Sequence, residues 1–326
     1  MIELIKGLVT KLTIGEQEAG QRIDNFLVKC LKGVPKSRIY RLLRNGELRV
    51  NSKRVTFSYR LQLGDRLRIP PVRVAASVNK APIGPIAPRL SRLALYEDDA
   101  LLAIDKPAGV AVHGGSGISR GCIEQLRLER PDWKFLELVH RLDRDTSGVL
   151  LLAKKLAALT GMHRLLREGQ ADKRYLVLVK GQWRDEKRSV RLALHKFLTP
   201  SGERRVAVKE DGQSAHTIFR LQQRWEHFSL LEAELKTGRT HQIRVHLSHL
   251  GFPLAGDDKY GDFQWNKQLQ SRGLKRMFLH AWRLSFQHPV TGERLRIEAP
   301  LPEALQTFLK RLDAPDAEFG VLSSAD

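Results

Sequence analysis

The sequence predicts an α+β fold with a mixed, mostly antiparallel sheet, preceded by a small separate N-terminal domain. Over residues 91–326, strand-like apolar runs and helical stretches do not alternate regularly, as they would in a doubly wound fold. Five prolines in residues 70–90 disfavour both helix and central strand, which is typical of a linker. We therefore expect an N-terminal domain at 1–69, a linker at 70–90 and a second domain at 91–326.

The charge of the chain indicates a polyanionic partner. Its 326 residues include 56 lysines and arginines against 36 aspartates and glutamates, a net charge of +20, and the 42% of hydrophobic residues is typical of a globular chain. Residues 1–90 alone hold 18 basic and 6 acidic residues, a net charge of +12. Such an excess favours nucleic acid as the partner.

The sequence predicts a cytoplasmic protein with no membrane partner. Its longest aliphatic run, Val149–Ala153, is far shorter than the roughly 20 apolar residues that span a bilayer. Residues 1–5 lack the basic start and long apolar stretch of a signal peptide. Cys30 and Cys122 form no paired motif, which indicates a reduced compartment and no cysteine-based metal site.

Two helices and three short strands are expected before the linker. Apolar residues at helical spacing predict the first helix at 23–31. Ser37 is placed to cap a second helix, which Asn45-Gly46 ends. The predicted strands lie at 48–50, 61–63 and 67–69, with a turn at Gly64-Asp65 between the last two.

The second helix and the turn after it carry a basic surface. Arg38 and Arg41 are three residues apart, with Arg44 nearly in line, so they share one face opposite the apolar stripe. Glu47 is the only acid between Lys36 and Arg60, which indicates a phosphate-binding surface more than an ordinary solvated face. The candidate RNA-binding residues are Lys36, Arg38, Arg41, Arg44, Arg49, Lys53 and Arg54.

Residues 20–69 resemble the S4 RNA-binding domain. The matching blocks, in order, are Arg22-Ile23-Asp24-Asn25-Phe26-Leu27, Ser37-Arg38, Asn45-Gly46-Glu47-Leu48-Arg49-Val50-Asn51 and Leu63-Gly64-Asp65. The spacing of all the blocks fits. The resemblance implies that this part of the chain binds RNA.

Strands in the second domain are expected at 101–104, 149–153, 175–179 and 230–235. Helices are expected at about 156–168, 240–250 and 302–312.

Two patterns that suggest a ligand site are better explained otherwise. Residues 114–117 form a glycine-rich run that lacks the Gly-Lys-Ser/Thr ending of a phosphate-binding loop, so we expect a flexible turn. His241, His246 and His249 are spaced by five and three residues, with Arg239 and Arg244 among them. Cations beside a divalent metal are unfavourable, so no metal is expected.

Asp143-Arg144-Asp145-Thr146 is the most informative acidic motif. An aspartyl-phosphate phosphatase stays an alternative for it, although such a pair should follow an apolar strand and here follows His140-Arg141-Leu142. A structural salt bridge is the simplest explanation of an Asp–Arg pair. However, an acid inside a basic loop, directly before a buried strand, weakens polyanion binding and therefore needs a reason.

The stretch from His140 to Leu151 resembles the HRLDxxTSGLL signature of the RluA-type pseudouridine synthases, with Val149 where leucine is usual. Other blocks agree in order over roughly residues 90–300. They are Ile104-Asp105-Lys106-Pro107-Ala108-Gly109-Val110-Ala111-Val112-His113, Lys173-Arg174-Tyr175, residues 235–247, Gly256-Asp257 and Lys259-Tyr260-Gly261. With the S4 resemblance in front, the chain is similar to the bacterial enzymes of this family that act on large-subunit ribosomal RNA.

The resemblance implies an isomerisation of uridine to pseudouridine on a flipped-out base, with no cofactor and no metal. It places the essential carboxylate at Asp143, as nucleophile at the sugar or as base at C2′, and leaves Asp145 solvated or structural. By the same resemblance Arg141 fills the space of the extruded base, Tyr175 stacks on the uracil and Arg244 pairs with Asp143. From the residues alone, Tyr175 could equally be an aromatic of the sheet.

The expected partner is large-subunit ribosomal RNA, and the protein is expected to be a monomer. A non-enzymatic RNA-binding assembly factor stays an alternative, because the S4-like segment and the charge fit it equally well. An assembly factor of this kind would not explain the sequence motifs around Asp143 and Tyr175.

Overall fold

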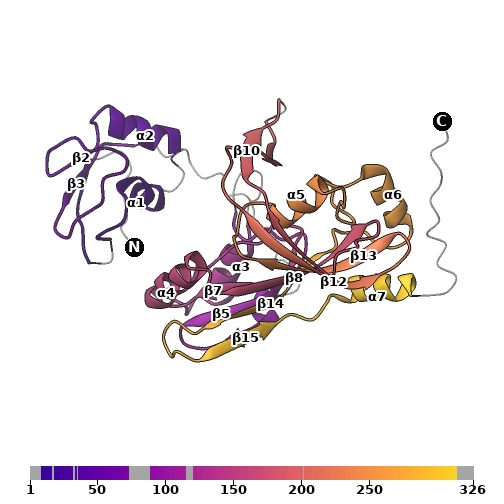
Figure 1. Ribbon diagram of the computed structural model, residues 1–326. Helices are drawn as coiled ribbons and strands as arrows, with labels where there is room; N and C mark the ends of the chain where they lie inside the picture. Colours follow the sequence, from indigo (N-terminus) through magenta and orange to yellow (C-terminus); the bar gives the residue numbers. More distant parts are fainter. Residues whose placement is uncertain are drawn as a thin grey trace. The chain divides into compact units, whose positions relative to one another are not determined.

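The computed structural model of the protein describes residues 9–16, 18–31, 34, 36–72, 89–114, 120–200 and 202–313. The chain divides into two compact units, Met1–Gly84 and Pro85–Asp326. The first is the indigo part of Figure 1 and the second runs from magenta to yellow. Most of the expected linker, at 73–88, lies outside the described residues.

The N-terminal unit is a three-stranded antiparallel sheet with two helices, in the strand order β1-β3-β2. Its elements are β1 (Thr10–Thr13), α1 (Ile23–Cys30), α2 (Lys36–Arg44), β2 (Arg49–Val50) and β3 (Arg66–Ile69). The apolar stripes expected for both helices are buried together in one core, which includes Phe26, Leu27 and Leu42. That core holds the helices against the sheet.

The expected strand at 61–63 is wrong. Leu61 is buried and Leu63 is 64% exposed, so the two side chains do not share one face as they would in a strand. The segment is a loop that turns at Gly64, which has a φ of +83°. Helix α2 begins at Lys36, one residue before its expected cap Ser37. It ends as expected, with Gly46 at a φ of +69°.

The second unit is built on one ten-stranded sheet, in the order β4-β5-β7-β14-β8-β13-β12-β9, with β15 beside β14 and β6 beside β7. Among the described strands of this sheet, β7 and β14 pair in parallel and the other pairs are antiparallel. This confirms the expected mixed, mostly antiparallel sheet. The strands are β4 (Ala94–Glu97), β5 (Leu101–Lys106), β6 (Glu137–Leu138), β7 (Ser147–Ala153), β8 (Asp172–Lys180), β9 (Lys187–Arg191), β12 (His216–Arg224), β13 (Phe228–Leu235), β14 (Leu279–Gln287) and β15 (Arg294–Glu298).

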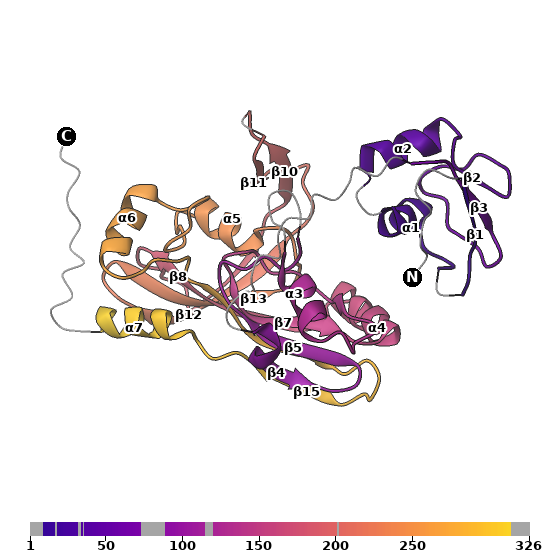
Figure 2. The ribbon, with the colours of Figure 1, turned by 180° about the vertical axis from the view of Figure 1, so that it is seen from behind.

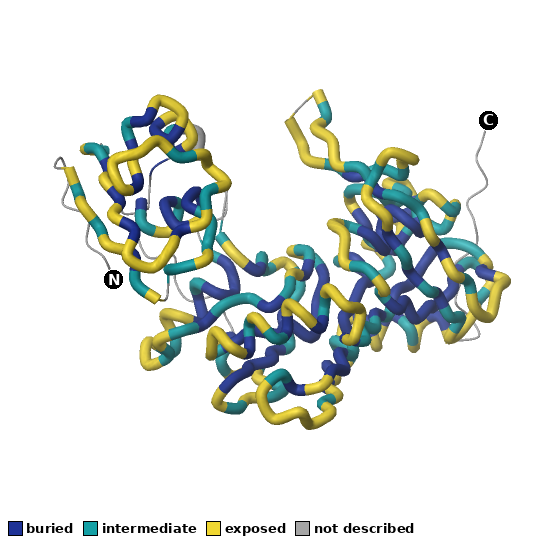
Figure 3. Tube along the Cα trace, turned by 60° about the vertical axis from the view of Figure 1, so that its left-hand side comes forward, coloured by how far each residue is buried: buried dark blue, intermediate teal, exposed yellow. Residues whose placement is uncertain are grey.

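Both faces of the sheet are covered, as the period of two along β7 requires. Leu150 and Leu152 enter one core with α3 (Cys122–Glu129) and α5 (Gln242–His249), and Leu151 enters another with α4 (Leu156–Arg167). A further core lies around Phe228, between α6 (Phe263–Ser271) and α7 (Glu303–Leu312). Figure 2 shows these helices from behind, and Figure 3 marks the buried stretches of the chain in dark blue.

A separate hairpin, β10 (Leu194–Leu198) and β11 (Arg204–Val208), projects from the sheet in both ribbon views (Figures 1 and 2). The chain enters the sheet through the short helix η1 (Leu90–Leu93). Within the described residues, no helix is long and apolar enough to cross a membrane.

Candidate active site

Asp143 lies in the loop between β6 and β7, and several hydrogen bonds fix that loop. The N–H of Thr146 donates to the carbonyl of Asp143 at 3.2 Å, and the N–H of Gly109 donates to the carbonyl of Arg144 at 2.9 Å. The loop leads directly into β7, in which all seven residues are buried. A rigid, buried strand therefore holds the carboxylate at its N-terminal end.

Lys106, at the end of β5, is a second anchor of this loop. Its ammonium is fully buried and donates to three carbonyls, those of Pro107 at 2.8 Å, Val110 at 2.7 Å and Arg144 at 3.0 Å. Three N–H donors match three acceptors, which compensates for the loss of water. Burial lowers the pKa of Lys106 to about 8, so it stays mostly protonated at neutral pH.

Gly148 allows β7 to lie very close to the neighbouring strand β14. It has a φ of +107°, and a Cβ at this position would collide with the backbone of Ala281 in the parallel strand β14. Only glycine combines this conformation with such a close approach.

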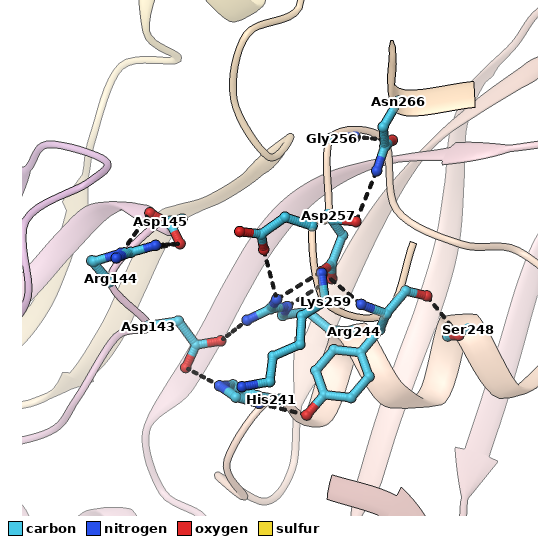
Figure 4. Close-up of polar contacts among 12 residues, drawn as sticks. Asp143, Arg144, Asp145, His241, Arg244, Ser248, Gly256, Asp257, Lys259 and Asn266 are labelled. Atoms are coloured by element: carbon cyan, nitrogen blue, oxygen red, sulfur yellow. Dashed lines mark hydrogen bonds and ion pairs between the residues drawn. The ribbon is translucent and has the colours of Figure 1, made fainter. Parts of the chain in front are cut away.

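Arg244, on α5, donates hydrogen bonds to two carboxylates (Figure 4). Its Nε and Nη2 each donate to Asp257 at 2.7 Å, in a bidentate pair, while Nη1 donates to Oδ2 of Asp143 at 3.2 Å. Arg244 is 4% exposed and Asp257 is fully buried. The bidentate partner of Arg244 is therefore Asp257, and Asp143 takes the donor that remains.

In the triad of Arg244, Asp257 and Asp143, the charges of Arg244 and Asp257 stabilise each other. Burial opposes the charge of Arg244, but the hydrogen bonds and charge of Asp257, followed by the charge of Asp143, raise its pKa. Burial also opposes ionisation of Asp257, and its hydrogen bonds from Arg244 outweigh that effect and hold its pKa below the ordinary value. Arg244 is therefore a permanent cation beside Asp143.

His241 faces the other oxygen of Asp143, with its Nε2 3.8 Å from Oδ1. It caps α5 in the left-handed region, at a φ of +53°, which is unusual for a side chain with a Cβ. The buried Gln242 fixes this turn, because its Oε1 accepts from Thr237 Oγ1 at 2.7 Å and from the N–H of Arg239 at 3.0 Å. Backbone strain of this kind is concentrated at functional sites.

Tyr175, in β8, is 7% exposed and forms part of the wall of the same cavity. Burial raises the pKa of its phenol, and the negative charge of Asp143 raises it further. The hydroxyl therefore stays protonated, and the ring is an apolar surface close to a carboxylate.

Asp143, Tyr175, His241 and Arg244 line one cavity of about 540 Å³. Among the described residues that line it, basic side chains outnumber acidic ones, and Asp143 is the one carboxylate. The charged and aromatic side chains of the lining include those of Arg141, Asp143, Arg167, Lys173, Tyr175, Arg239, His241 and Arg244. Its basic side chains suit a polyanion, and the ring of Tyr175 suits a planar, polar group attached to that polyanion.

Comparison with known proteins identifies the family. A family model described as RNA pseudouridylate synthase matches residues 100–249, and one described as S4 domain matches residues 21–67. The chain is 52% identical over 313 residues to the ribosomal large subunit pseudouridine synthase C of Pasteurella multocida (strain Pm70), covering 95% of this chain and 96% of that protein.

The chain belongs to the RNA pseudouridylate synthase family.

A second relative agrees with this assignment. The ribosomal large subunit pseudouridine synthase C of Escherichia coli (strain K12) is 53% identical over 309 residues, covering 92% of this chain and 96% of that protein. Both of these relatives are named as the C type. The chain is therefore an enzyme, and the predictions of a phosphatase or a non-enzymatic assembly factor are set aside.

A solved structure shares the fold of this pseudouridylate synthase. Human RNA Pseudouridylate Synthase Domain Containing 4 has a TM-score of 0.56 and 25% sequence identity, covering 69% of this chain and 94% of that chain. The α+β prediction with its mostly antiparallel sheet is confirmed.

The structure brings Asp143, Tyr175 and Arg244 together in this pseudouridylate synthase, from three separate parts of the sequence. Arg141 lies exposed at the same cavity. His140 has a structural contact, because its Nε2 accepts from the N–H of Leu151 at 3.1 Å, and burial lowers its pKa to about 4. Oδ1 of Asp145 lies 3.1 Å from Nε of Arg144. Figure 4 shows these two side chains pointing toward each other.

The sequence reasoning missed four residues of the site, namely Lys106, His241, Asp257 and Tyr260. A signal for all four was present, because they lie in blocks that resemble the family, namely Ile104–His113, residues 235–247, Gly256-Asp257 and Lys259-Tyr260-Gly261, and those blocks gave these four residues no role. His241 was considered as a metal ligand only. Among the described residues, no group of three or more His, Cys, Asp or Glu is placed to hold a metal ion. Residues 115–117 of the glycine-rich run lie outside the described part of the chain.

The basic residues expected to bind RNA lie on the surface of the S4-like unit. Arg41, Arg44, Arg49, Lys53 and Arg54 are exposed and Arg38 is half-buried. The side chain of Lys36 lies outside the described residues.

The basic surface of this unit is wider than expected. Lys11, Arg66 and Arg68 line a broad concavity of about 1250 Å³ together with Arg49. The alternation in Arg66-Leu67-Arg68-Ile69 was a signal for this, because it places both arginines on one face of β3.

Proposed function

We propose that this enzyme converts specific uridines of large-subunit ribosomal RNA to pseudouridine, with Asp143 as its reacting carboxylate. The observation that carries the proposal is the position of Asp143. It lies at a cavity that also presents Tyr175, with a permanently charged arginine on one side and an imidazole on the other. The names of the relatives support large-subunit ribosomal RNA as the substrate. We also propose that the protein acts in the cytoplasm as a monomer.

The chemistry needs one ionised carboxylate. The bond from C1′ of the ribose to N1 of uracil breaks, the uracil turns, and a bond from C1′ to C5 forms; C5 loses its proton and N1 gains one. No electrons are transferred and no water is consumed, so the reaction needs no cofactor. Asp143 acts as nucleophile at the sugar or as base at C2′, and in both cases the hydrogen bond from Arg244 directs it.

The target base must leave its stack to reach this cavity. Tyr175 offers its ring to the extruded uracil, and Arg141, at the cavity edge, fills the space that the base leaves in the RNA. Arg141, Arg167 and Lys173 form no ion pair with any carboxylate of the described residues, so their charges are available for phosphates. Burial lowers the pKa of Lys173, and a phosphate would compensate for that burial.

Replacing Tyr175 by leucine tests the stacking role. Leucine fills most of the space in the core and has no π-face. We therefore expect Tyr175→Leu to lose about as much activity as Tyr175→Ala, which also lacks the ring. Stacking is worth roughly 1–3 kcal/mol per base in other proteins. The measurement is the kcat/KM for release of tritium from uridines labelled at C5. Wild-type activity in a folded Tyr175→Leu variant would show that the ring is only part of the core.

Deleting residues 1–80 tests the S4-like unit. The truncated enzyme should bind ribosomal RNA more weakly, with a shallower plot of log affinity against log salt, because each lost phosphate contact removes roughly 0.7 to 0.9 from the slope. The proposed catalytic residues all lie beyond residue 100, so turnover should persist at high RNA concentration. Equal slopes for both proteins would show that the basic surface is only solvated. Complete loss of turnover in a folded truncation would mean that the boundary at 70–90 is misplaced.

A further inference from the structure

We propose that His241 and Tyr260 form a positioning pair for Asp143, in which the Tyr260 hydroxyl orients the imidazole so that its Nε2–H points at the carboxylate. This inference rests on the proposed role of Asp143. Neither residue had an assigned role in the sequence blocks. Both act through Asp143 and neither needs to touch the uridine.

The two oxygens of Asp143 face different groups (Figure 4). Oδ2 accepts from Arg244 at 3.2 Å, and Oδ1 faces the Nε2 of His241 at 3.8 Å. With Arg244 alone, the carboxylate could rotate about that single contact. A second donor on Oδ1 fixes the plane of the carboxylate and leaves its remaining lone pairs for the substrate.

The hydrogen bonds of Tyr260 fit the tautomer of His241 that this proposal needs. The N–H of Val206 donates to the Tyr260 hydroxyl oxygen at 3.0 Å, and that oxygen lies 2.8 Å from Nδ1 of His241. A phenol has one proton to donate and Val206 already uses one of its lone pairs, so in the proposed pair the hydroxyl donates its proton to Nδ1. A neutral imidazole then carries its own proton on Nε2, the nitrogen that faces Asp143.

Both side chains have the protonation state that this arrangement needs. Burial lowers the pKa of His241, with Asp143 opposing the effect and Arg244 and Lys259 adding to it, so the imidazole is neutral near pH 7. Burial raises the pKa of Tyr260, so its hydroxyl keeps its proton. The distance of 3.8 Å is longer than a hydrogen bond, and such contacts commonly shorten when the substrate binds.

Tyr260 supports both groups that face Asp143. Its ring lies beneath the guanidinium of Arg244, whose Cζ is 5.1 Å from the ring centre. Its hydroxyl contacts His241. The hydroxyl is held by Val206, a residue of the projecting β11. The neighbouring Lys259 pairs with Glu203, just before that strand, at 2.7 Å. The pair is therefore anchored on the hairpin and on α5 together.

The test is a double-mutant cycle measured under single-turnover conditions with saturating enzyme. Tyr260→Phe keeps the ring beneath Arg244 and removes only the hydroxyl, and His241→Ala removes the donor. We expect each to slow tritium release from C5-labelled uridine in ribosomal RNA by roughly tenfold or more, the size of one charge-assisted hydrogen bond. The dissociation constant for RNA should be unchanged. The double variant should be no slower than His241→Ala, because the hydroxyl acts through the imidazole.

Two control variants separate this role from a general loss of packing. His249→Ala alters an exposed histidine on the same helix, and Tyr96→Phe removes a hydroxyl that donates to Asp98, a residue outside the cavity lining. Both should react at the wild-type rate. Thermal unfolding of every variant shows which ones are folded.

Two results would overturn the pair. One is a wild-type single-turnover rate in folded Tyr260→Phe. The other is a double variant whose loss is the product of the two single losses, because the hydroxyl would then act independently of His241. Failure of the proposed function looks different, since it appears as turnover by Asp143→Asn, a variant that leaves this pair in place.

Discussion

Asp143→Asn is expected to abolish pseudouridine formation while the affinity for ribosomal RNA stays within a few-fold of wild type. The amide keeps the size of the side chain and its place between Arg244 and His241, but it can act neither as a nucleophile nor as a base. Release of tritium from C5-labelled uridine measures the reaction, because forming the bond from C1′ to C5 displaces that hydrogen. RNA binding is measured separately by filter retention.

Asp145→Asn is the matched control for this prediction. Asp145 lies two residues away in the same loop, but its carboxylate pairs with the exposed Arg144 and does not line the cavity. It should keep most of its activity. Turnover by the Asp143 variant, or loss of activity in Asp145→Asn alone, would refute the assignment.

Arg244→Ala should have the second largest effect, and a larger one than Arg239→Ala. The change removes the cation beside Asp143 and leaves the fully buried Asp257 with no partner for its charge. Breaking a buried ion pair on one side costs about 3–5 kcal/mol, so this variant should also be less stable. Arg239 is exposed and donates to the carbonyl of Ser214 at 3.0 Å, so its loss leaves the triad intact.

A double variant separates stability from catalysis here. Arg244→Met with Asp257→Asn removes both buried charges, which is far less costly than removing one. We expect its unfolding temperature to recover toward that of wild type while the tritium-release assay shows no activity. Activity comparable to wild type in either folded Arg244 variant would contradict the role of Arg244.

The sequence predicted those parts of the fold that depend on local pattern. The fully apolar Val149–Ala153 had to be a strand buried on both faces, and the spacing of Ile23, Phe26 and Leu27 had to form one helical stripe. The strand at 61–63 failed for a physical reason. Leu61 and Leu63 have the spacing of a strand, but only one of them finds a place in the core.

The sequence predicted only those site residues whose roles follow from a recognisable motif. Asp143, Tyr175 and Arg244 came from resemblance, since nothing in their spacing along the chain shows that they meet. Asp257 was missed because its role depends on the bidentate geometry of Arg244, which is a property of the folded chain. Tyr260 was missed for a similar reason, because its hydroxyl joins Val206 of one element to His241 of another.

The most direct test of the account is a map of pseudouridines in large-subunit ribosomal RNA from cells that lack this protein. We expect specific sites to lose pseudouridine, to regain it when the wild-type protein is restored, and to stay unmodified when only Asp143→Asn is supplied. An unchanged map in cells without the protein, or restored sites with the Asn variant, would contradict the account.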